Sequence, residues 1–306
     1  MEQMLDVEAL RSEFPALATG QVFVDGPGGT QVPTRVVTAV SDALVRAMSN
    51  VGGAFASSRR SEVTVAAARS AASDLTGGRA DEMVFGPNMT SLTFAFSRAL
   101  AEEWNAGDRI VLSGLDHDAN ITPWVRAAAS AGAEVVYAEI RDDATLDVDH
   151  LISLIDERTR LVALTACSNA FGSLVEVSRV SAAARQVGAL TYVDAVHFAP
   201  HRFIDVHALG CDFLVASSYK FFGPHLGVLW GRREHLERLP AFKVRPAPTP
   251  DPRAGKPAPR LSRCWPALPP PSTISPRWAG VATGAGPSRP PSGRSPLMRR
   301  RLGSGS

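Results

Sequence analysis

The sequence predicts an α/β fold whose mostly parallel sheet is covered by helices on both faces. Short apolar runs alternate with segments of helical periodicity between residues 81 and 193, the pattern of successive strand–helix–strand units. Hydrophobic residues make up 45% of the 306 residues, which is enough for a sizeable core. This length allows one large domain or two ordinary ones.

The N-terminal part is expected to contain three helices and one short strand. Apolar residues at helical spacing predict a helix over residues 7–17, stopped by Pro15 and Gly20. Residues 22–24 are predicted as a strand that leads into the glycine-rich loop 25–30. Such a loop can approach a ligand closely, although a plain turn is the simpler interpretation. Two further helices are expected over residues 36–48 and 62–75.

Strands and helices then alternate through the body of the chain. The expected strands cover residues 83–85, 109–112, 134–138, 161–164, 190–193, 213–216 and 227–230. The expected helices cover residues 92–104, 123–131, 148–155 and 177–187.

Polar residues follow directly after several predicted strands: Thr90, His117, Asn169, Asp194 and Ser217. Each has an ordinary explanation alone, such as a helix cap at Thr90 or Ser91, a turn at Asp194 and a loop at His117. Ligands of open α/β sheets bind outside the carboxyl ends of the strands. The common placement of these residues therefore predicts one ligand-binding crevice.

A lysine lies between the last two predicted strands. Lys220 follows the hydroxyl residues Ser217, Ser218 and Tyr219 and precedes two phenylalanines. Apolar surroundings favour the neutral, nucleophilic amine, which suits Schiff-base chemistry with a carbonyl cofactor. The alternative is a lysine that extends from the strand end into solvent.

Charge and cysteine content exclude several classes of protein. Ten of the 32 Lys and Arg residues follow Asp251, but no Asp or Glu does, so residues 1–252 carry 22 basic and 30 acidic side chains. An acidic body argues against nucleic-acid binding. Three scattered cysteines predict neither a disulfide framework nor a metal site. No segment resembles a signal peptide or a membrane span, so a cytoplasmic location is expected.

Five segments resemble the class V aminotransferase family when they are taken in order. They are residues 88–90, 117–120, 168–172, 194–197 and 217–220. Within the family, the sequence is most similar to cysteine desulfurase-like and isopenicillin-N-epimerase-like members, over about residues 5–250. The resemblance implies a fold-type-I enzyme that binds pyridoxal 5′-phosphate (PLP), acts on a small amino-acid substrate and works as a homodimer.

The resemblance also implies a role for each matching residue. Lys220 would form the Schiff base and carry a proton to or from the substrate Cα. Asp194 would keep the ring nitrogen of PLP protonated, and His117 would stack on the ring and could move protons. The remaining positions would hold the cofactor: Asn169 and His197 near the ring hydroxyl, and Thr90, Ser91, Ser217 and Tyr219 around the phosphate. Tyr219 stands where many relatives carry histidine.

Two departures from the family pattern leave the reaction open. Cys167 and Cys211 belong to the sheet region, and Cys264 does not lie in a loop like that of a desulfurase. The basic residue that binds the substrate carboxylate has no match. Desulfuration, transamination and epimerisation therefore all remain possible. The alternatives are a truncated, PLP-binding remnant without turnover and a nucleotide-binding protein that uses loop 25–30.

The composition changes after residue 250. Residues 251–306 contain no acidic residue after Asp251, and residues 253–306 hold eleven of the 23 prolines. We expect a disordered Pro/Arg-rich tail in place of the family's small C-terminal domain. We propose a shifted reading frame as the explanation. One possible set of codons for residues 254–260, read from the third base, encodes Trp-Glu-Thr-Gly-Thr-Gln, which resembles a loop of the family. The coding DNA would decide this point.

Overall fold

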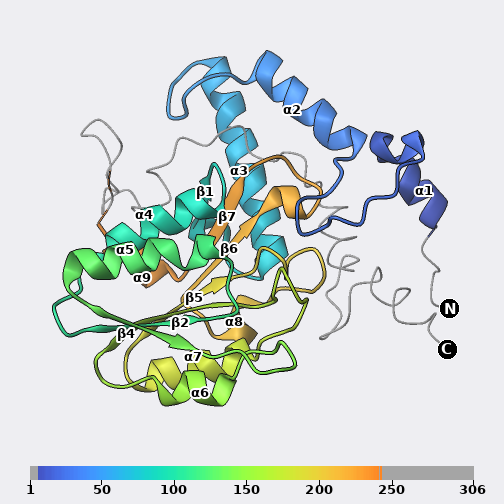
Figure 1. The fold of residues 1–306 in the computed structure, drawn as a ribbon. Coiled ribbons are helices and arrows are strands. Elements are labelled where there is room, and N and C mark those ends of the chain that lie inside the picture. Colours follow the sequence, from blue (N-terminus) through green and yellow to red (C-terminus); the bar gives the residue numbers. More distant parts are fainter. Residues whose placement is uncertain (1–5, 241, 243–306) are drawn as a thin grey trace, which may run out of the picture.

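The computed structural model describes residues 6–240 and 242, which form a mixed sheet of seven strands between two layers of helices (Figure 1). The strand order is β1-β7-β6-β5-β4-β2-β3. The strands are β1 (Met83–Gly86), β2 (Arg109–Ser113), β3 (Glu134–Ala138), β4 (Thr159–Thr165), β5 (Leu190–Asp194), β6 (Phe213–Ser217) and β7 (Gly227–Gly231). The predicted α/β architecture is confirmed. The predicted tail, with its altered reading frame, lies outside the described residues.

One reversed strand explains where the site forms. β7 is antiparallel to both β1 and β6, whereas the pairs from β6 across to β3 are parallel. β1 therefore runs in the same direction as the parallel strands. The carboxyl ends of β1, β2, β4, β5 and β6 meet at one edge of the sheet, and β7 begins at that edge with Gly227.

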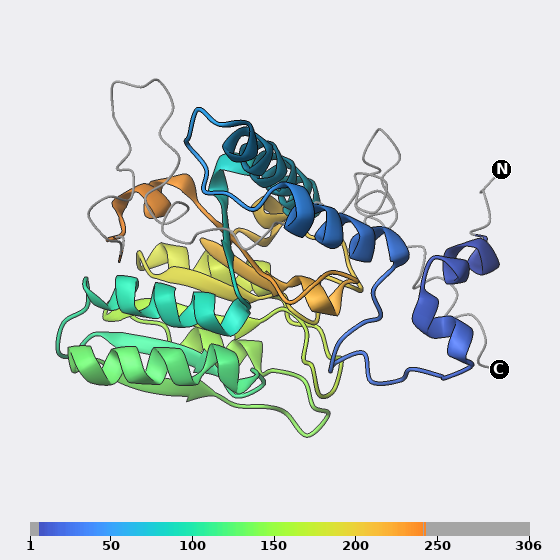
Figure 2. The ribbon, with the colours of Figure 1, turned by 90° about the horizontal axis from the view of Figure 1, so that it is seen from above.

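Helices bury both faces of the sheet, as Figure 2 shows from above. One face packs against α4 (Met89–Ala101), α5 (Thr122–Ala131) and α9 (Arg233–Arg238). The other packs against α3 (Ala56–Thr76), α6 (Val148–Ser153), α7 (Val177–Gln186) and α8 (Val206–Leu209).

Aromatic rings fix the packing of the first of these layers. Phe96 of α4 meets Phe213 edge to face at 5.5 Å between centroids, and Trp124 of α5 meets Tyr192 at 4.8 Å. All four side chains are at most 1% exposed. Edge-to-face pairs of buried aromatic rings stabilise a fold by roughly 0.5–1.5 kcal/mol beyond their burial. They hold α4 and α5 against the centre of the sheet.

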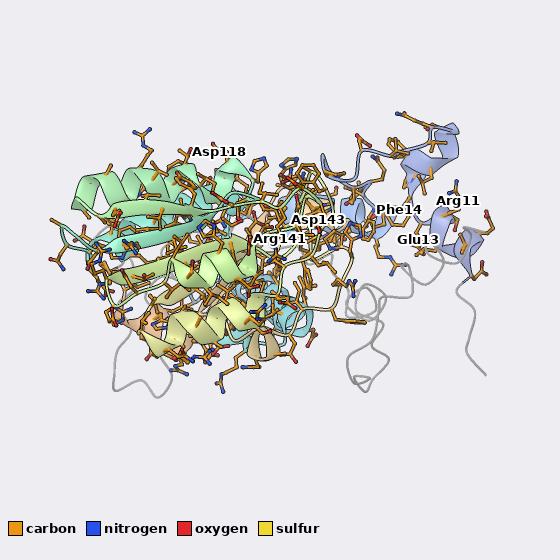
Figure 3. All side chains as sticks on the ribbon, turned by 60° about the horizontal axis from the view of Figure 1, so that its bottom comes forward. Arg11, Glu13, Phe14, Asp118, Arg141 and Asp143 are labelled. Carbon is orange, nitrogen blue, oxygen red and sulfur yellow. The ribbon has the colours of Figure 1, made fainter. Side chains whose placement is uncertain are left out.

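The N-terminal segment differs from the prediction in two places. The helix expected over residues 7–17 is split into α1 (Val7–Ser12) and the 3₁₀ helix η1 (Pro15–Thr19), because proline lacks the N–H that a continuous helix needs. The strand expected at residues 22–24 is wrong. Val22 and Val24 are 80% and 88% exposed, and no neighbouring strand pairs with them in the described part of the chain. Figure 3 shows Arg11, Glu13 and Phe14 on this segment.

The next two helices are confirmed with small changes at their ends. They are α2 (Thr34–Arg46) and α3, which begins six residues before the expected start at residue 62. α4 starts at Met89 instead of residue 92 because Asn88 caps it: the Asn88 side chain accepts a hydrogen bond from Ser91 N–H at 2.8 Å. α8 and α9 were not expected from the sequence, since each spans only four to six residues. No helix among the described residues is long and apolar enough to cross a bilayer.

Replacing Gly227 with alanine is expected to disrupt the start of β7. A Cβ atom there would lie 2.5 Å and 2.6 Å from the carbonyl carbon and oxygen of Asn88. Because both atoms are backbone, relief requires α4 to shift, and overpacking of this kind costs about 1–3 kcal/mol. Urea unfolding of Gly227→Ala should show this loss. Gly26→Ala is the control, because a Cβ atom there meets nothing within 4 Å. Equal midpoints for the two variants would contradict the prediction.

Candidate functional site

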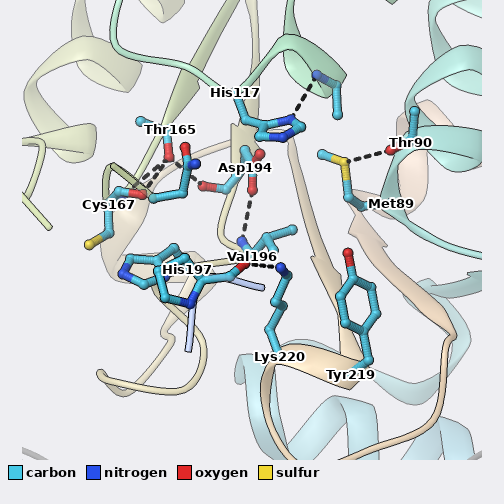
Figure 4. Close-up of a pocket in the computed structure, with 13 residues that line it drawn as sticks. Met89, Thr90, His117, Thr165, Cys167, Asp194, Val196, His197, Tyr219 and Lys220 are labelled. Atoms are coloured by element: carbon cyan, nitrogen blue, oxygen red, sulfur yellow. Dashed lines mark hydrogen bonds between the residues drawn. The ribbon is translucent and has the colours of Figure 1, made fainter. Parts of the chain in front are cut away.

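A pocket opens at the edge where the strands end (Figure 4). Seven of the nine predicted site residues line it: Thr90, His117, Asn169, Asp194, His197, Tyr219 and Lys220. Met89, Thr165, Cys167, Val196 and Pro27 contribute to its walls. Ser91 and Ser217 are not among the lining residues. The predicted crevice therefore exists, and the predicted residues that line it lie up to 130 positions apart in the sequence.

Asp194 supplies a buried acid to this pocket. It is the last residue of β5 and is 5% exposed. Its Oδ1 accepts a hydrogen bond from Val196 N–H at 2.8 Å. Burial raises the pKa of this carboxyl group to about 6, whereas the Val196 N–H and the charges of His117 and Lys220 act in the opposite direction. A carboxylate in such a place favours a cationic partner within the pocket.

Lys220 ends the short 3₁₀ helix η4 (Ser218–Lys220), which follows β6 directly. Its Nζ donates a hydrogen bond to the carbonyl oxygen of Pro27 and lies 4.8 Å from the centroid of the Tyr219 ring. Burial lowers the pKa of the Lys220 amine, and the negative charge of Asp194 opposes this shift. The direction agrees with the expectation of a more readily neutral, nucleophilic amine.

His117 presents an imidazole from the turn after β2. Its Nδ1 accepts a hydrogen bond from Ala119 N–H at 3.0 Å at the start of the 3₁₀ helix η3 (Asp118–Asn120). A neutral imidazole that accepts through Nδ1 carries its proton on Nε2. Figure 4 shows the His117 ring facing the same space as Asp194 and Lys220. The site thus combines an acid, an amine and an imidazole.

The N-terminus of α4 forms the opposite wall. Thr90 lines the pocket in the first turn of this 13-residue helix. Ser217 is fully buried, and its Oγ accepts a hydrogen bond from Met89 N–H at 3.1 Å, so it anchors the helix to β6. Ser91 N–H donates to the Asn88 side chain. A helix N-terminus favours an anion, and the predicted phosphate contacts of these residues stay predictions.

The glycine-rich residues 25–30, here called the strap, pack against the lysine turn. Thr30 donates to the Tyr219 carbonyl oxygen from its N–H at 2.8 Å and from its hydroxyl at 3.1 Å. The Thr30 hydroxyl oxygen accepts from Phe222 N–H at 2.7 Å. Phe222 has a φ of 73°, a conformation that non-glycine residues adopt only when the surrounding contacts hold them there. The strap therefore fixes the turn that carries Lys220.

Tyr219 completes the side of the pocket below Thr90. Its ring stacks on His225 with centroids 4.1 Å apart and planes inclined by 10°. In Figure 4 its hydroxyl group points toward Met89 and Thr90. Burial and the charge of Asp194 raise the pKa of this phenol. Tyr219 is therefore a neutral hydrogen-bonding group, whereas a histidine at this position could carry a charge.

Sequence reasoning missed a second acid, Asp116. It precedes His117 and accepts hydrogen bonds from the Asn120 side chain at 2.6 Å and from Thr165 N–H at 2.8 Å. Burial, together with the negative charge of Asp194, raises its pKa to about 7. The sequence did contain a signal for Asp116, because this acidic residue stands between a predicted strand and His117.

The two raised pKa values predict how stability depends on pH. Folding favours the protonated forms of Asp194 and Asp116, so their contribution is full below about pH 4 and is lost as the pH rises through about 6 and 7. For Asp194 this loss amounts to at most about 3 kcal/mol. We expect the stability of the cofactor-free wild type, relative to an Asp116→Asn/Asp194→Asn variant, to fall between pH 4 and 8. Urea midpoints at several pH values measure the difference, and a constant difference would contradict the assignment.

Solved structures share this architecture. Cysteine desulfurase from Thermococcus onnurineus is 26% identical with a TM-score of 0.81, and the match covers 92% of this chain and 71% of that one. The cysteine desulfurase CsdA from Escherichia coli is 28% identical with a TM-score of 0.75, covering 91% and 69%. The fold is that of the fold-type-I PLP-dependent transferases, as predicted.

Sequence comparison identifies the family within this fold. The profile of the aminotransferase class-V family matches residues 22–246, and the chain belongs to this family. A probable cysteine desulfurase from Xylella fastidiosa is 36% identical over 250 residues, and an aminotransferase-like protein, FGM3, from Gibberella zeae is 35% identical over 240. These matches cover 78% and 76% of this chain. The chain spans about three fifths of the length of both relatives, at 59%.

The pocket fits the cofactor of this family. PLP carries a ring nitrogen, an aldehyde and a phosphate, which require an acid, an amine and an anion site. Asp194 supplies the buried acid, Lys220 the amine and the start of α4 a helix N-terminus. A protonated ring nitrogen would give the Asp194 carboxylate a partner for a charge that is costly to bury alone. The residues present therefore match the chemical groups of PLP.

Proposed function

We propose that the chain is a PLP-dependent enzyme that acts at the Cα of a small amino acid. The observation that carries the proposal is the convergence of Lys220, Asp194 and His117 on one pocket in a member of this family. When bound, PLP supplies an electron sink that stabilises negative charge at the substrate Cα.

Each residue of the pocket has a definite task in this proposal. The Lys220 amine attaches the cofactor covalently and later takes or returns the proton at Cα. The Asp194 carboxylate would pair with the ring nitrogen and keep it protonated. The His117 imidazole would pack on the ring. Asn169 and His197 would bind its hydroxyl, and the start of α4, with Thr90 and Tyr219, would hold the phosphate.

The cysteines bear on which reaction follows. Cys167 and Cys211 are free thiols that are 4% and 0% exposed. Burial raises the pKa of both, that of Cys211 to about 12, so neither readily forms the thiolate that sulfur transfer needs. Cys264 lies outside the described residues. Transamination, epimerisation and desulfuration stay open within the proposal. Buried free thiols also fit the reducing cytoplasmic location that we propose.

The test begins with the absorption spectrum of the purified chain mixed with PLP, followed by product analysis. A visible band that borohydride removes, together with alanine, pyruvate or D-amino acids formed from an amino-acid panel, would support the enzyme. Cofactor binding without any product would instead favour the second candidate, a PLP-binding chain without turnover. Retention of ATP or NAD but not PLP would overturn both.

We also propose that the chain forms a homodimer through α2 and the segment after it. Six large apolar side chains on α2 and this segment are more than half exposed: Val37, Leu44, Val45, Met48, Val51 and Phe55. Several large exposed apolar side chains on one segment are typical of protein interfaces. Light scattering should give a dimer mass for the wild type and a lower mass for Val45→Lys. A monomeric wild type would contradict this part of the proposal.

A further inference from the structure

Asp116 connects two parts of the pocket that come from different strands. Its Oδ2 accepts a hydrogen bond from the backbone N–H of Thr165, the last residue of β4. Its Oδ1 accepts from Asn120 Nδ2, and Asn120 Oδ1 in turn accepts from Trp124 Nε1 at 2.9 Å. Asn120 and Trp124 are both 0% exposed. The carboxyl group therefore ties the turn that carries His117 to the end of β4 and to α5.

The same contacts lead to Asp194. Thr165 is the register partner of Asp194 between β4 and β5. The Asp194 carbonyl oxygen accepts from Ala166 N–H at 2.8 Å and from the Thr165 hydroxyl at 3.3 Å. Asp116 thus holds the strand end that flanks Asp194, while its neighbour His117 projects into the pocket.

We infer that Asp116 is a positioning residue of this site: its carboxyl group holds the His117 turn and the Asp194 strand end together and places a second acidic group behind the ligand-facing one. Asp116 is not among the residues that line the pocket, so it acts through His117, Thr165 and Asp194. It therefore takes no direct part in binding or proton transfer.

Charge couples Asp116 to the pocket as well. The groups that act on the two acids come from three places: His117 from the turn after β2, Asp194 from β5 and Lys220 from the turn after β6. Burial raises the pKa of Asp194 to about 6 and that of Asp116 to about 7, and the negative charge of Asp194 contributes to the shift of Asp116. Above this range two carboxylates favour a cationic group in the pocket, within it Asp194 is the more ionised of the two acids, and below it both are largely protonated.

The first experiment rests on the proposed function and compares the wild type with Asp116→Asn and Asp118→Asn. Asp118 is the matched control: it lies exposed in the same turn (Figure 3) and its Oδ1 accepts from the Thr122 hydroxyl at 2.8 Å. PLP affinity is measured between about pH 5 and pH 8.5. The ionisations of PLP itself cancel when affinities are compared at each pH.

The affinity ratio of wild type to Asp116→Asn should rise about tenfold across this range as the Asp116 carboxyl becomes charged. Asp118→Asn should follow the wild type throughout. A ratio that stays constant with pH, as a purely structural role would give, overturns the inference.

A second experiment uses the cofactor-free chain and decides the inference if the wild type binds no PLP or if Asp116→Asn does not fold. Carboxyl ¹³C NMR follows the titration of Asp116 in the wild type and in Asp194→Asn. The midpoint of Asp116 should lie near pH 7 in the wild type and fall by about one unit in the variant, because a neighbouring negative charge is removed. An unchanged midpoint overturns the inference. Failure of PLP to bind the wild type, by contrast, counts only against the proposed function.

Discussion

Replacing Lys220 with alanine is expected to abolish covalent attachment of PLP and to lower turnover by at least roughly 10²–10⁴-fold. The Lys220 amine is the nucleophile and the proton carrier of the proposed reaction, and no other residue of the pocket can supply a primary amine. The chain has lysine at positions 220, 243 and 256 alone. Borohydride followed by peptide mass spectrometry therefore locates the attachment without ambiguity.

Two variants control this experiment. Lys220→Arg keeps the positive charge but cannot condense with an aldehyde, so it should fail as completely as alanine. Lys243→Ala should retain the label. The stability of Lys220→Ala, measured by urea unfolding, should differ little from that of the wild type. Among the described residues, the Lys220 side chain donates a single hydrogen bond, to the Pro27 carbonyl oxygen. A borohydride label found on Lys243, Lys256 or the N-terminal amine would refute the assigned role of Lys220.

The change Asp194→Asn should affect activity and stability in opposite directions. Loss of the carboxylate removes the partner of the cofactor ring nitrogen, and we expect turnover to fall by about 10²-fold or more. At pH 8 the wild type buries this charge at 5% exposure, and its pKa of about 6 shows that folding disfavours the ionised form. The cofactor-free variant should therefore be more stable than the wild type at pH 8, and the advantage should disappear below about pH 4.

Urea midpoints at the two pH values and turnover at saturating PLP measure both effects. Asp118→Asn, from the exposed turn, should change neither quantity. Equal destabilisation of Asp194→Asn at both pH values would mean that the carboxyl group is valuable mainly as a hydrogen-bond acceptor for Val196. The prediction that the Asp194 carboxylate raises turnover but lowers stability at pH 8 would then be wrong.

The sheet could be predicted from the sequence because its strands are nearly uniform apolar runs. Strands β6 and β7 are buried at every position, and the flanking helices show the expected periodicity. The strand expected at residues 22–24 failed because Val22 and Val24, although typical of strands in composition, have no strand to pair with among residues 6–240. Apolar content alone does not provide a hydrogen-bonding partner for a strand.

The site was predictable to the extent that it depends on strand ends. Asp194 and His117 were found because Asp194 ends an apolar run and His117 lies in the turn after one. Ser217 was predicted to contact the ligand. In the structure its side chain accepts a hydrogen bond from Met89 N–H and does not line the pocket. Asp116 was missed because its importance depends on Thr165, 49 residues further along the chain. Sequence periodicity reports neither side-chain direction nor contacts of this range.

The position of β1 has a consequence for protein synthesis. β1 lies at the end of the sheet order and pairs with β7, with Met83 opposite Trp230. Asn88 and Met89 therefore reach their final places only after β6 and β7 have left the ribosome, since Ser217 and Gly227 support them. A nascent chain halted before residue 231 would contain Asp194, His117 and Lys220, but its α4 would not yet be packed against the complete sheet. The ribosome thus releases nearly the whole described chain before a pocket able to receive an anion exists, and until then the apolar side of α4 is available to chaperones.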